Sequence, residues 1–119
     1  MTLSEIRDIL EADVLIGHDR LHLRVRGGFG SDLLSDMLHG PTNDVVLLTG
    51  LTNIQVVRSS VVSAVTAIVI VGGKTPSSEI ITQAQAHELP LMVTPFTMFT
   101  SCGKLFAQGL PGIDCTKGD

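Results

Sequence analysis

The sequence has no tryptophan or tyrosine and only four phenylalanines among its 119 residues. Side chains that stack on nucleic-acid bases are therefore scarce, and a formal net charge of −4 provides no basic surface to displace the counterions of a polyanion. Both features argue against nucleic-acid binding. Because hydrophobic residues still make up 44% of the chain, we expect a folded core built from aliphatic side chains.

Cysteine and long apolar segments are also scarce. Two cysteines, Cys102 and Cys115, are too few for a disulfide framework, so we expect a reducing, cytoplasmic compartment. No apolar segment approaches the roughly 20 residues that a membrane-spanning helix needs, and the charged first ten residues do not resemble a signal peptide. We therefore expect no membrane partner and a single domain with its own core.

The start of the chain contains one helix pattern and two strand patterns. Thr2 and Glu5 have the spacing of a capping box, which predicts a helix over residues 3–11. A short apolar segment predicts a strand over residues 13–16. Strict alternation of apolar and polar residues predicts a second, half-buried strand over residues 21–26.

Glycines then interrupt the pattern at residues 27–30, where we expect a flexible loop. Ser31 is a good N-cap for a following helix that ends at Gly40-Pro41. Two carboxylates in that helix would repel a bare phosphate but would suit a magnesium ion or the arginine of a partner, although helix capping explains them more simply. The candidate partner-binding residues are Gly28, Phe29, Gly30, Ser31, Asp32 and Asp36.

A strand–turn–helix unit repeats three times after residue 44. The apolar segments are 45–48, 66–71 and 89–93, the turns are 49–52, 72–75 and 94–97, and the helices end near residues 63, 87 and 108. Continuous apolar segments that alternate with helices predict parallel strands buried on both faces. The expected fold is thus a single α/β domain with a mostly parallel sheet and helices packed on it.

The three turns of this repeat are the best candidates for a ligand site. In α/β sheets ligands bind beyond the carboxyl ends of the strands, and the stretch 45–78 contains no acidic residue, its only charges being Arg58 and Lys74. Helix N-termini with free N–H groups suit anions, although ordinary capped turns are the alternative. The candidate ligand-binding residues are Thr49, Gly50, Thr52, Asn53, Arg58, Gly72, Gly73 and Lys74.

The caps of these helices carry their own predictions. Thr52 and Gln55 have the spacing of a second capping box, and Thr75 is placed to cap a helix that begins at Pro76. The tripeptide Gly73-Lys74-Thr75 resembles the end of a nucleoside-triphosphate-binding loop. That loop needs an earlier glycine where this chain has Ile68, so a kinase or ATPase site is not expected.

No arrangement typical of metal binding or catalysis is present. The four histidines lie in separate predicted elements, where we expect surface positions, and no zinc-site spacing occurs. Cys102 lies in the last predicted helix, where a buried structural thiol is the usual case and a redox role the less common one. Gly103, in the same helix, predicts the close approach of another backbone. We expect no cofactor.

Three segments together resemble a known family, the stand-alone DRTGG-domain proteins of anaerobic bacteria. They are Gly28-Phe-Gly-Ser-Asp-Leu-Leu-Ser-Asp-Met-Leu38, Leu47-Leu-Thr-Gly-Leu-Thr-Asn53 and Met98-Phe-x-x-Cys-Gly-Lys-Leu-x-x-x-Gly-Leu110. The resemblance implies a DRTGG-like domain over residues 1–112 and a flexible C-terminal tail over residues 113–119. Of the Asp-Arg and Thr-Gly-Gly that name the family, only Gly72 and Gly73 remain in this chain.

The same resemblance implies a regulatory function rather than catalysis. DRTGG domains accompany ligand-sensing CBS domains and are similar to the N-terminal, non-catalytic domain of HPr kinase/phosphorylase. The resemblance also implies a homodimer. The expected function is therefore binding of a small anionic, nucleotide-like ligand, docking on a metabolic or redox enzyme, or both. Two alternatives are a pure interaction subunit of a hydrogenase or electron-transfer complex and a thiol-dependent redox protein.

Overall fold

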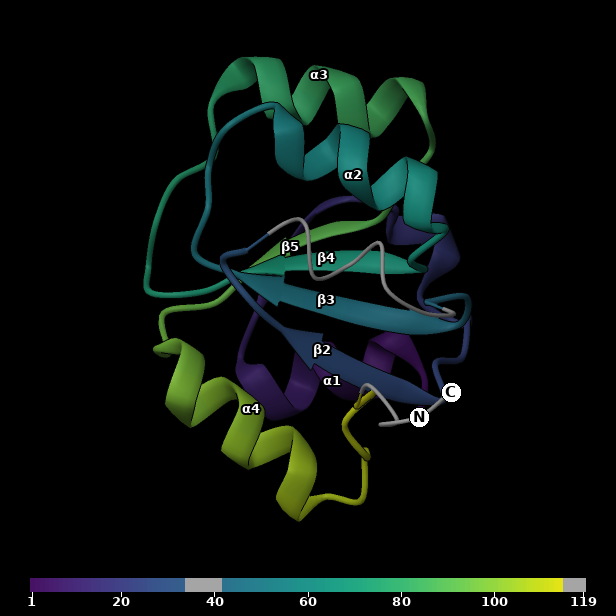
Figure 1. The fold of residues 1–119 in the computed structure, drawn as a ribbon, viewed down its shortest axis with the longest axis vertical. Coiled ribbons are helices and arrows are strands. Elements are labelled where there is room, and N and C mark those ends of the chain that lie inside the picture. The colour runs from purple at the N-terminus through teal and green to yellow at the C-terminus, as the bar shows by residue number, and fades with distance from the viewer. Residues whose placement is uncertain (34–41, 115–119) are drawn as a thin grey trace.

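The computed structural model describes residues 1–33 and 42–114, which form one five-stranded sheet with helices on both faces (Figure 1). The strand order is β1-β5-β4-β3-β2, and every neighbouring pair is parallel except β1 with β5. The strands are β1 (Asp13–Ile16), β2 (Gly27–Gly30), β3 (Val45–Thr49), β4 (Ala67–Ile70) and β5 (Leu91–Val93). The predicted fold, a mostly parallel α/β domain, is confirmed.

The helices form two layers. They are α1 (Leu3–Leu10), α2 (Gln55–Ser63), α3 (Ser78–Ala86) and α4 (Met98–Ala107), with a 3₁₀ turn η1 (His18–Arg20) after β1. α2 and α3 cover one face of the sheet, and α1 and α4 cover the other (Figure 1). No described helix is long and apolar enough to cross a membrane.

Two apolar cores explain why the central strands are continuously hydrophobic. Val46 and Leu48 of β3 point into the core under α1 and α4, whereas Leu47 between them points into the core under α2 and α3. Successive strand residues face opposite sides of a sheet, so a strand covered on both sides presents neither row of side chains to water. All five residues of β3 are buried.

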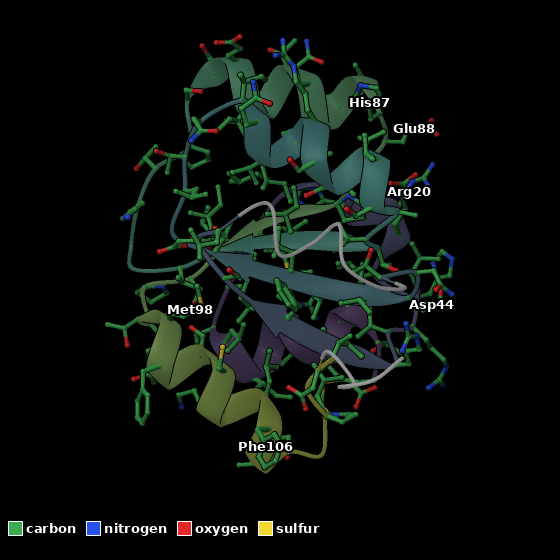
Figure 2. All side chains as sticks on the ribbon, viewed as in Figure 1. Arg20, Asp44, His87, Glu88, Met98 and Phe106 are labelled. Carbon is green, nitrogen blue, oxygen red and sulfur yellow. The ribbon has the colours of Figure 1, made fainter. Side chains whose placement is uncertain are left out.

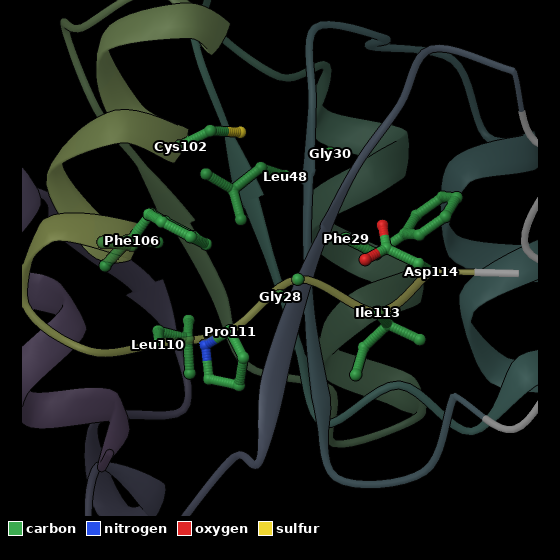
Figure 3. A pocket seen from close by; sticks show the side chains of 12 residues that line it. Gly28, Phe29, Gly30, Leu48, Cys102, Phe106, Leu110, Pro111, Ile113 and Asp114 are labelled. Carbon is green, nitrogen blue, oxygen red and sulfur yellow. The ribbon is translucent and has the colours of Figure 1, made fainter. Parts of the chain in front are cut away.

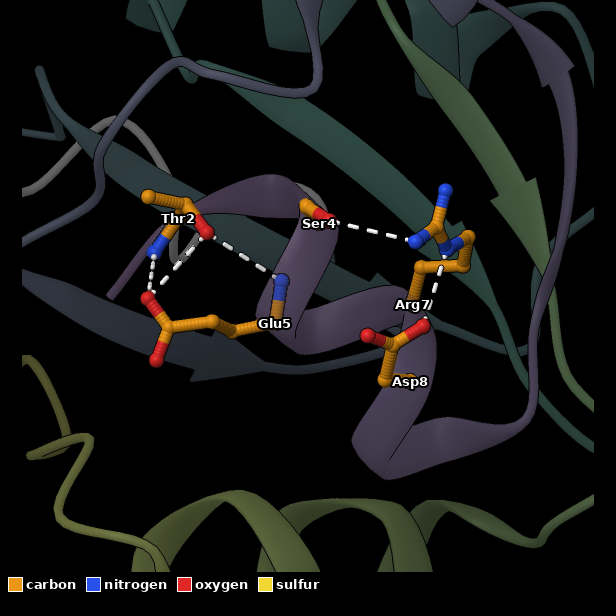
Figure 4. A network of polar contacts seen from close by, with 5 residues as sticks. All are labelled: Thr2, Ser4, Glu5, Arg7 and Asp8. Atoms are coloured by element: carbon orange, nitrogen blue, oxygen red, sulfur yellow. Dashed lines mark hydrogen bonds and ion pairs between the residues drawn. The ribbon is translucent and has the colours of Figure 1, made fainter.

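The first helix begins at the predicted capping box (Figure 4). The Glu5 backbone N–H donates to Thr2 Oγ1 at 3.2 Å, and the Thr2 backbone N–H donates to Glu5 Oε1 at 3.0 Å. These bonds satisfy backbone donors that a helix N-terminus leaves without an intrahelical partner. Arg7, one turn further, donates to Ser4 and to Asp8 on the same exposed side of α1 (Figure 4).

Two predictions for residues 21–30 are wrong. Residues 21–26 are not a strand of the sheet and pair instead with the start of the chain. Leu3 N–H donates to Leu23 O, and Val25 N–H donates to Met1 O. Residues 27–30, expected as a loop, are β2 and pair in parallel with β3. Neighbours pack directly against the glycine backbone of β2, since a Cβ on Gly27 would lie 2.4 Å from Ile113 Cδ1.

Two predicted helix starts are also wrong by two residues. The Thr52–Gln55 capping box is not formed, because Asn53 Oδ1 accepts the Gln55 N–H at 2.9 Å and α2 begins at Gln55. Thr75 does not cap α3. Ser77 does, accepting the Ile80 N–H at 3.3 Å. A serine nearer to the first turn thus displaces the predicted cap of α3, whereas the N-cap residue of α2, Ile54, makes no side-chain cap.

Two further predictions, the helix after Ser31 and the flexible C-terminal tail, fall only partly within the described residues. Residues 31–33 are not helical, and Ser31 Oγ accepts the Leu33 N–H at 2.9 Å; the remainder of the predicted helix, with Asp36, lies outside the described residues. Near the other end, Gly28 N–H donates to Pro111 O, and Ile113 N–H donates to Gly28 O. Residues 115–119 are not described, so the flexible tail stays a prediction.

Candidate functional site

The three predicted turns meet at the carboxyl ends of β3, β4 and β5. Gly72 N–H donates to Phe96 O at 2.7 Å, and Gly73 N–H donates to Thr94 O at 3.0 Å, which joins the second turn to the third. Lys74 Nζ donates to Gly50 O at 2.7 Å, which joins the second turn to the first. We call these turns, residues 49–53, 72–76 and 94–97, the turn cluster.

Asp32 contacts the turn cluster, although the sequence placed it in a different candidate set. Its Oδ1 accepts the Gly50 backbone N–H at 2.7 Å and the Thr49 hydroxyl at 3.1 Å. The cause is strand register: Gly30 is level with Leu48 in the parallel pair, so the chain two residues later reaches Gly50. The turn cluster is therefore not free of acidic groups in space, even though the stretch 45–78 is free of them in sequence.

Glycine is required at several positions of the turn cluster. Gly72 and Gly73 have φ values of 83° and 69°, in the left-handed region that favours glycine. At Gly50, a Cβ would lie 3.2 Å from Lys74 Nζ and 3.5 Å from both carboxylate oxygens of Asp32. The ammonium and the carboxylate thus lie close to the same glycine, without forming an ion pair with each other.

A hollow of about 360 Å³ opens beside Lys74. Residues 73–76 and Thr94 line it from the turn cluster, and Glu11 and Asp13 line it from the junction of α1 with β1. Both carboxylates come from the antiparallel edge of the sheet, so the sequence near Lys74 does not predict their presence. A ligand in this hollow would meet Lys74 on one side and negative charge on the other.

Three of the predicted ligand-binding residues are not joined to this arrangement. Arg58 is exposed on α2, and its side chain forms no hydrogen bond or ion pair with the described residues. The Asn53 side chain accepts the Gln55 N–H at the start of α2. Thr52 is half-buried. The groups that the structure brings together are thus Thr49, Gly50, Gly72, Gly73 and Lys74.

A second hollow of about 250 Å³ lies between β2 and α4 (Figure 3). Its walls are mainly apolar and include Gly28, Phe29 and Gly30 of the predicted partner-binding set, with Leu48, Phe106 and Ile113. Asp114 is the one charged side chain among the described lining residues. Such a surface suits an apolar partner better than an anion.

Cys102 lines the same apolar hollow, and burial raises the pKa of its thiol. A raised pKa favours the thiol over the reactive thiolate. The nearby cation, Lys104, has its Nζ 4.7 Å from the centre of the Phe96 ring. The close approach predicted at Gly103 is wrong, since nothing described lies within 4 Å of a Cβ there. A Cβ on Gly30, in contrast, would lie 2.8 Å from Cys102 Sγ.

Metal binding finds no support in the described part of the chain. No group of three or more histidine, cysteine or acidic side chains is arranged to hold an ion there. The three described histidines, His18, His22 and His87, are exposed as predicted, and His39 lies outside the described residues.

Fold and turn cluster together define a small α/β domain with a polar, glycine-containing edge at the carboxyl ends of its parallel strands. A comparison with protein families matches residues 5–106 to the DRTGG domain. The chain therefore belongs to the DRTGG domain family, which confirms the resemblance seen in its sequence.

A solved structure shares this fold. It contains the CBS and DRTGG domains of the regulatory region of Clostridium perfringens pyrophosphatase, complexed with the activator diadenosine tetraphosphate. The match has a TM-score of 0.73 and 23% sequence identity over 92% of this chain. This chain spans 47% of that longer structure. A comparison with curated proteins finds no match.

Proposed function

We propose that this domain is a non-catalytic regulatory domain that senses a small anionic, nucleotide-like ligand at its turn cluster. The observation that carries the proposal is the convergence of Lys74, the Gly50 peptide and the Thr49 hydroxyl at one edge of the sheet. An ammonium, a backbone N–H and a hydroxyl are the groups that proteins use to hold phosphate oxygens.

Membership of the DRTGG family supports the regulatory part of this proposal. In the pyrophosphatase, the structurally similar DRTGG domain belongs to a regulatory region, and the activator of that protein is a dinucleoside polyphosphate. For the present chain, a ligand of the same chemical class is the best first probe. Its phosphates would contact Lys74, and its bases or sugars would occupy the hollow of about 360 Å³.

The double substitution Asn53→Asp with Lys74→Glu tests this function. It places two negative charges at the turn cluster, and an aspartate at residue 53 keeps a side-chain oxygen that can accept the Gln55 N–H at the start of α2. We expect calorimetric binding of diadenosine tetraphosphate to be lost while the melting temperature changes little. Unchanged binding in the double variant would remove the site assignment.

Arg20→Met is a control for the loss of a positive charge away from the proposed site. Arg20 is half-buried and pairs with Glu88 at 3.0 Å, at the end of the sheet opposite to Met98 and the turn cluster (Figure 2). Loss of this positive charge changes the net charge without touching the proposed site. Binding by this variant should therefore equal that of the wild-type protein.

A second candidate function is self-association through α4. Phe99 and Phe106 are 89% and 71% exposed and lie two turns apart on one side of this helix, and Phe106 lines the apolar hollow of Figure 3. A two-fold symmetric interface needs a protruding side chain and a hollow on the same surface, because each copy inserts its side chain into the hollow of the other. We propose a homodimer in which Phe99 of each copy enters the hollow of the other. Docking on a hydrogenase or another redox enzyme stays a prediction.

A further inference from the structure

The groups assigned to ligand binding already hold an anionic oxygen of the chain itself. Asp32 Oδ1 accepts both the Gly50 N–H, at 2.7 Å, and the Thr49 hydroxyl, at 3.1 Å. A phosphate oxygen would need the same two donors in the same geometry. The carboxylate of Asp32 and a phosphate group of a ligand therefore exclude each other.

We propose that Asp32 is an internal competitor, which a phosphate-bearing ligand must displace from Gly50 and Thr49. The inference rests on the proposed function of the turn cluster and adds a mechanism of selectivity to it. A competing carboxylate carries one negative charge. Ligands with several charges, such as polyphosphates, displace it more readily than monocarboxylates do, because they gain more from Lys74.

The positions of the three groups fit such an exchange. Thr49 and Gly50 are buried at the end of a central strand, so the two donors stay in place. Asp32 is exposed, so its carboxylate can return to water without crossing the core. Lys74 donates to Gly50 O but forms no ion pair in the described chain, and its charge is therefore not neutralised by Asp32.

Removal of the competitor tests the inference. Diadenosine tetraphosphate and inorganic pyrophosphate are titrated calorimetrically into the wild-type protein, Asp32→Ala and Asp32→Asn. Asp32→Ala frees both donors, and hydrogen bonds to charged groups are strong enough for us to expect about tenfold tighter binding. Asp32→Asn keeps an uncharged acceptor oxygen and should fall between the two. The asparagine variant also keeps the test possible if the alanine variant folds poorly.

Asp19→Ala is the matched control. It removes one negative charge from an exposed position in η1, so it reproduces the change in net charge without touching the turn cluster. Its affinity should equal that of the wild-type protein. An equal gain in Asp19→Ala and Asp32→Ala would show a general charge effect and overturn the inference.

The remaining outcomes separate the inference from the proposed function. Equal affinities for the wild-type protein and both Asp32 variants leave the function standing and overturn the competitor. Weaker binding in Asp32→Ala also overturns it, because Asp32 would then assist the ligand. Failure of every variant to bind either probe overturns the proposed function together with the inference.

Discussion

Single residues test the packing of the core most directly, and Ser60 is the clearest case. Its side chain is completely buried in α2, and its hydroxyl has no hydrogen-bond partner among the described residues. A buried hydroxyl without a partner costs free energy that an alanine at the same place avoids. We expect Ser60→Ala to raise the free energy of unfolding by about 1 kcal/mol in urea denaturation.

Ser59→Ala separates this effect from helix propensity. Ser59 lies next to Ser60 in α2 but is only half-buried, and the same change of residue type gives the same gain in propensity. The stabilisation by Ser60→Ala should exceed that by Ser59→Ala. A loss of stability in Ser60→Ala would contradict the assignment of an unpaired hydroxyl.

Cys102 supports a second prediction at the scale of one residue. Burial raises the pKa of its thiol, so little thiolate is present near neutral pH. In a Cys115→Ser background, we expect iodoacetamide to label native Cys102 much more slowly than the same cysteine in urea, with a rate that rises with pH. Rapid labelling of the native protein at pH 7 would favour the thiol-redox alternative.

At the scale of one element, the start of α1 predicts a pH dependence of stability. Hydrogen bonds from the Thr2 backbone N–H and then from the Thr2 hydroxyl lower the pKa of Glu5. A carboxyl group whose pKa is lower in the folded state stabilises the protein above its unfolded pKa. This contribution is lost as the pH falls below the ordinary glutamate pKa and through the lower pKa of the folded state.

Glu5→Gln tests that contribution. We expect the wild-type protein to be more stable than this variant at pH 7 and the difference to shrink at pH 3, as measured by chemical denaturation. Glu11→Gln is a control on the same element, since Glu11 follows the last turn of α1, outside the capping box. A difference that grows at low pH would contradict the role of the Glu5 carboxylate.

The elements also show what the sequence predicts and what it does not. β3 and β4 were predicted from continuous apolar segments, because burial on both faces leaves a pattern in the chain itself. β2 was missed because Gly-Gly-Phe-Gly has little strand propensity, and its pairing depends on side chains from distant segments such as Ile113. The apparent strand at 21–26 packs beside α1, outside the sheet.

The candidate site was also predicted in one part and missed in another. The meeting of its three turns follows from parallel strands, which the sequence predicts. The presence of Asp32 beside Gly50 follows from the register of β2 on β3, and that of Glu11 and Asp13 beside Lys74 follows from the antiparallel β1. Both depend on pairings between segments far apart in the chain, for which the local sequence carries no signal.

At the scale of the whole molecule, the proposed homodimer predicts a change in mass. The double substitution Phe99→Ser with Phe106→Ser removes the exposed apolar side chains of α4. We expect light scattering after size exclusion to show a dimer for the wild-type protein and a monomer for this variant. Val62→Ser is the control, because Val62 is 76% exposed on α2, on the opposite face of the sheet. A monomeric wild-type protein would contradict the proposed dimer.

The central claim is that ligand sensing takes place at the turn cluster. Titration of the ¹⁵N-labelled protein with diadenosine tetraphosphate, followed by amide chemical shifts, locates binding directly. The account predicts that the largest shifts occur at Gly50, Gly72, Gly73 and Lys74. Shifts confined to β2 and α4, or no shifts at millimolar ligand, would contradict it.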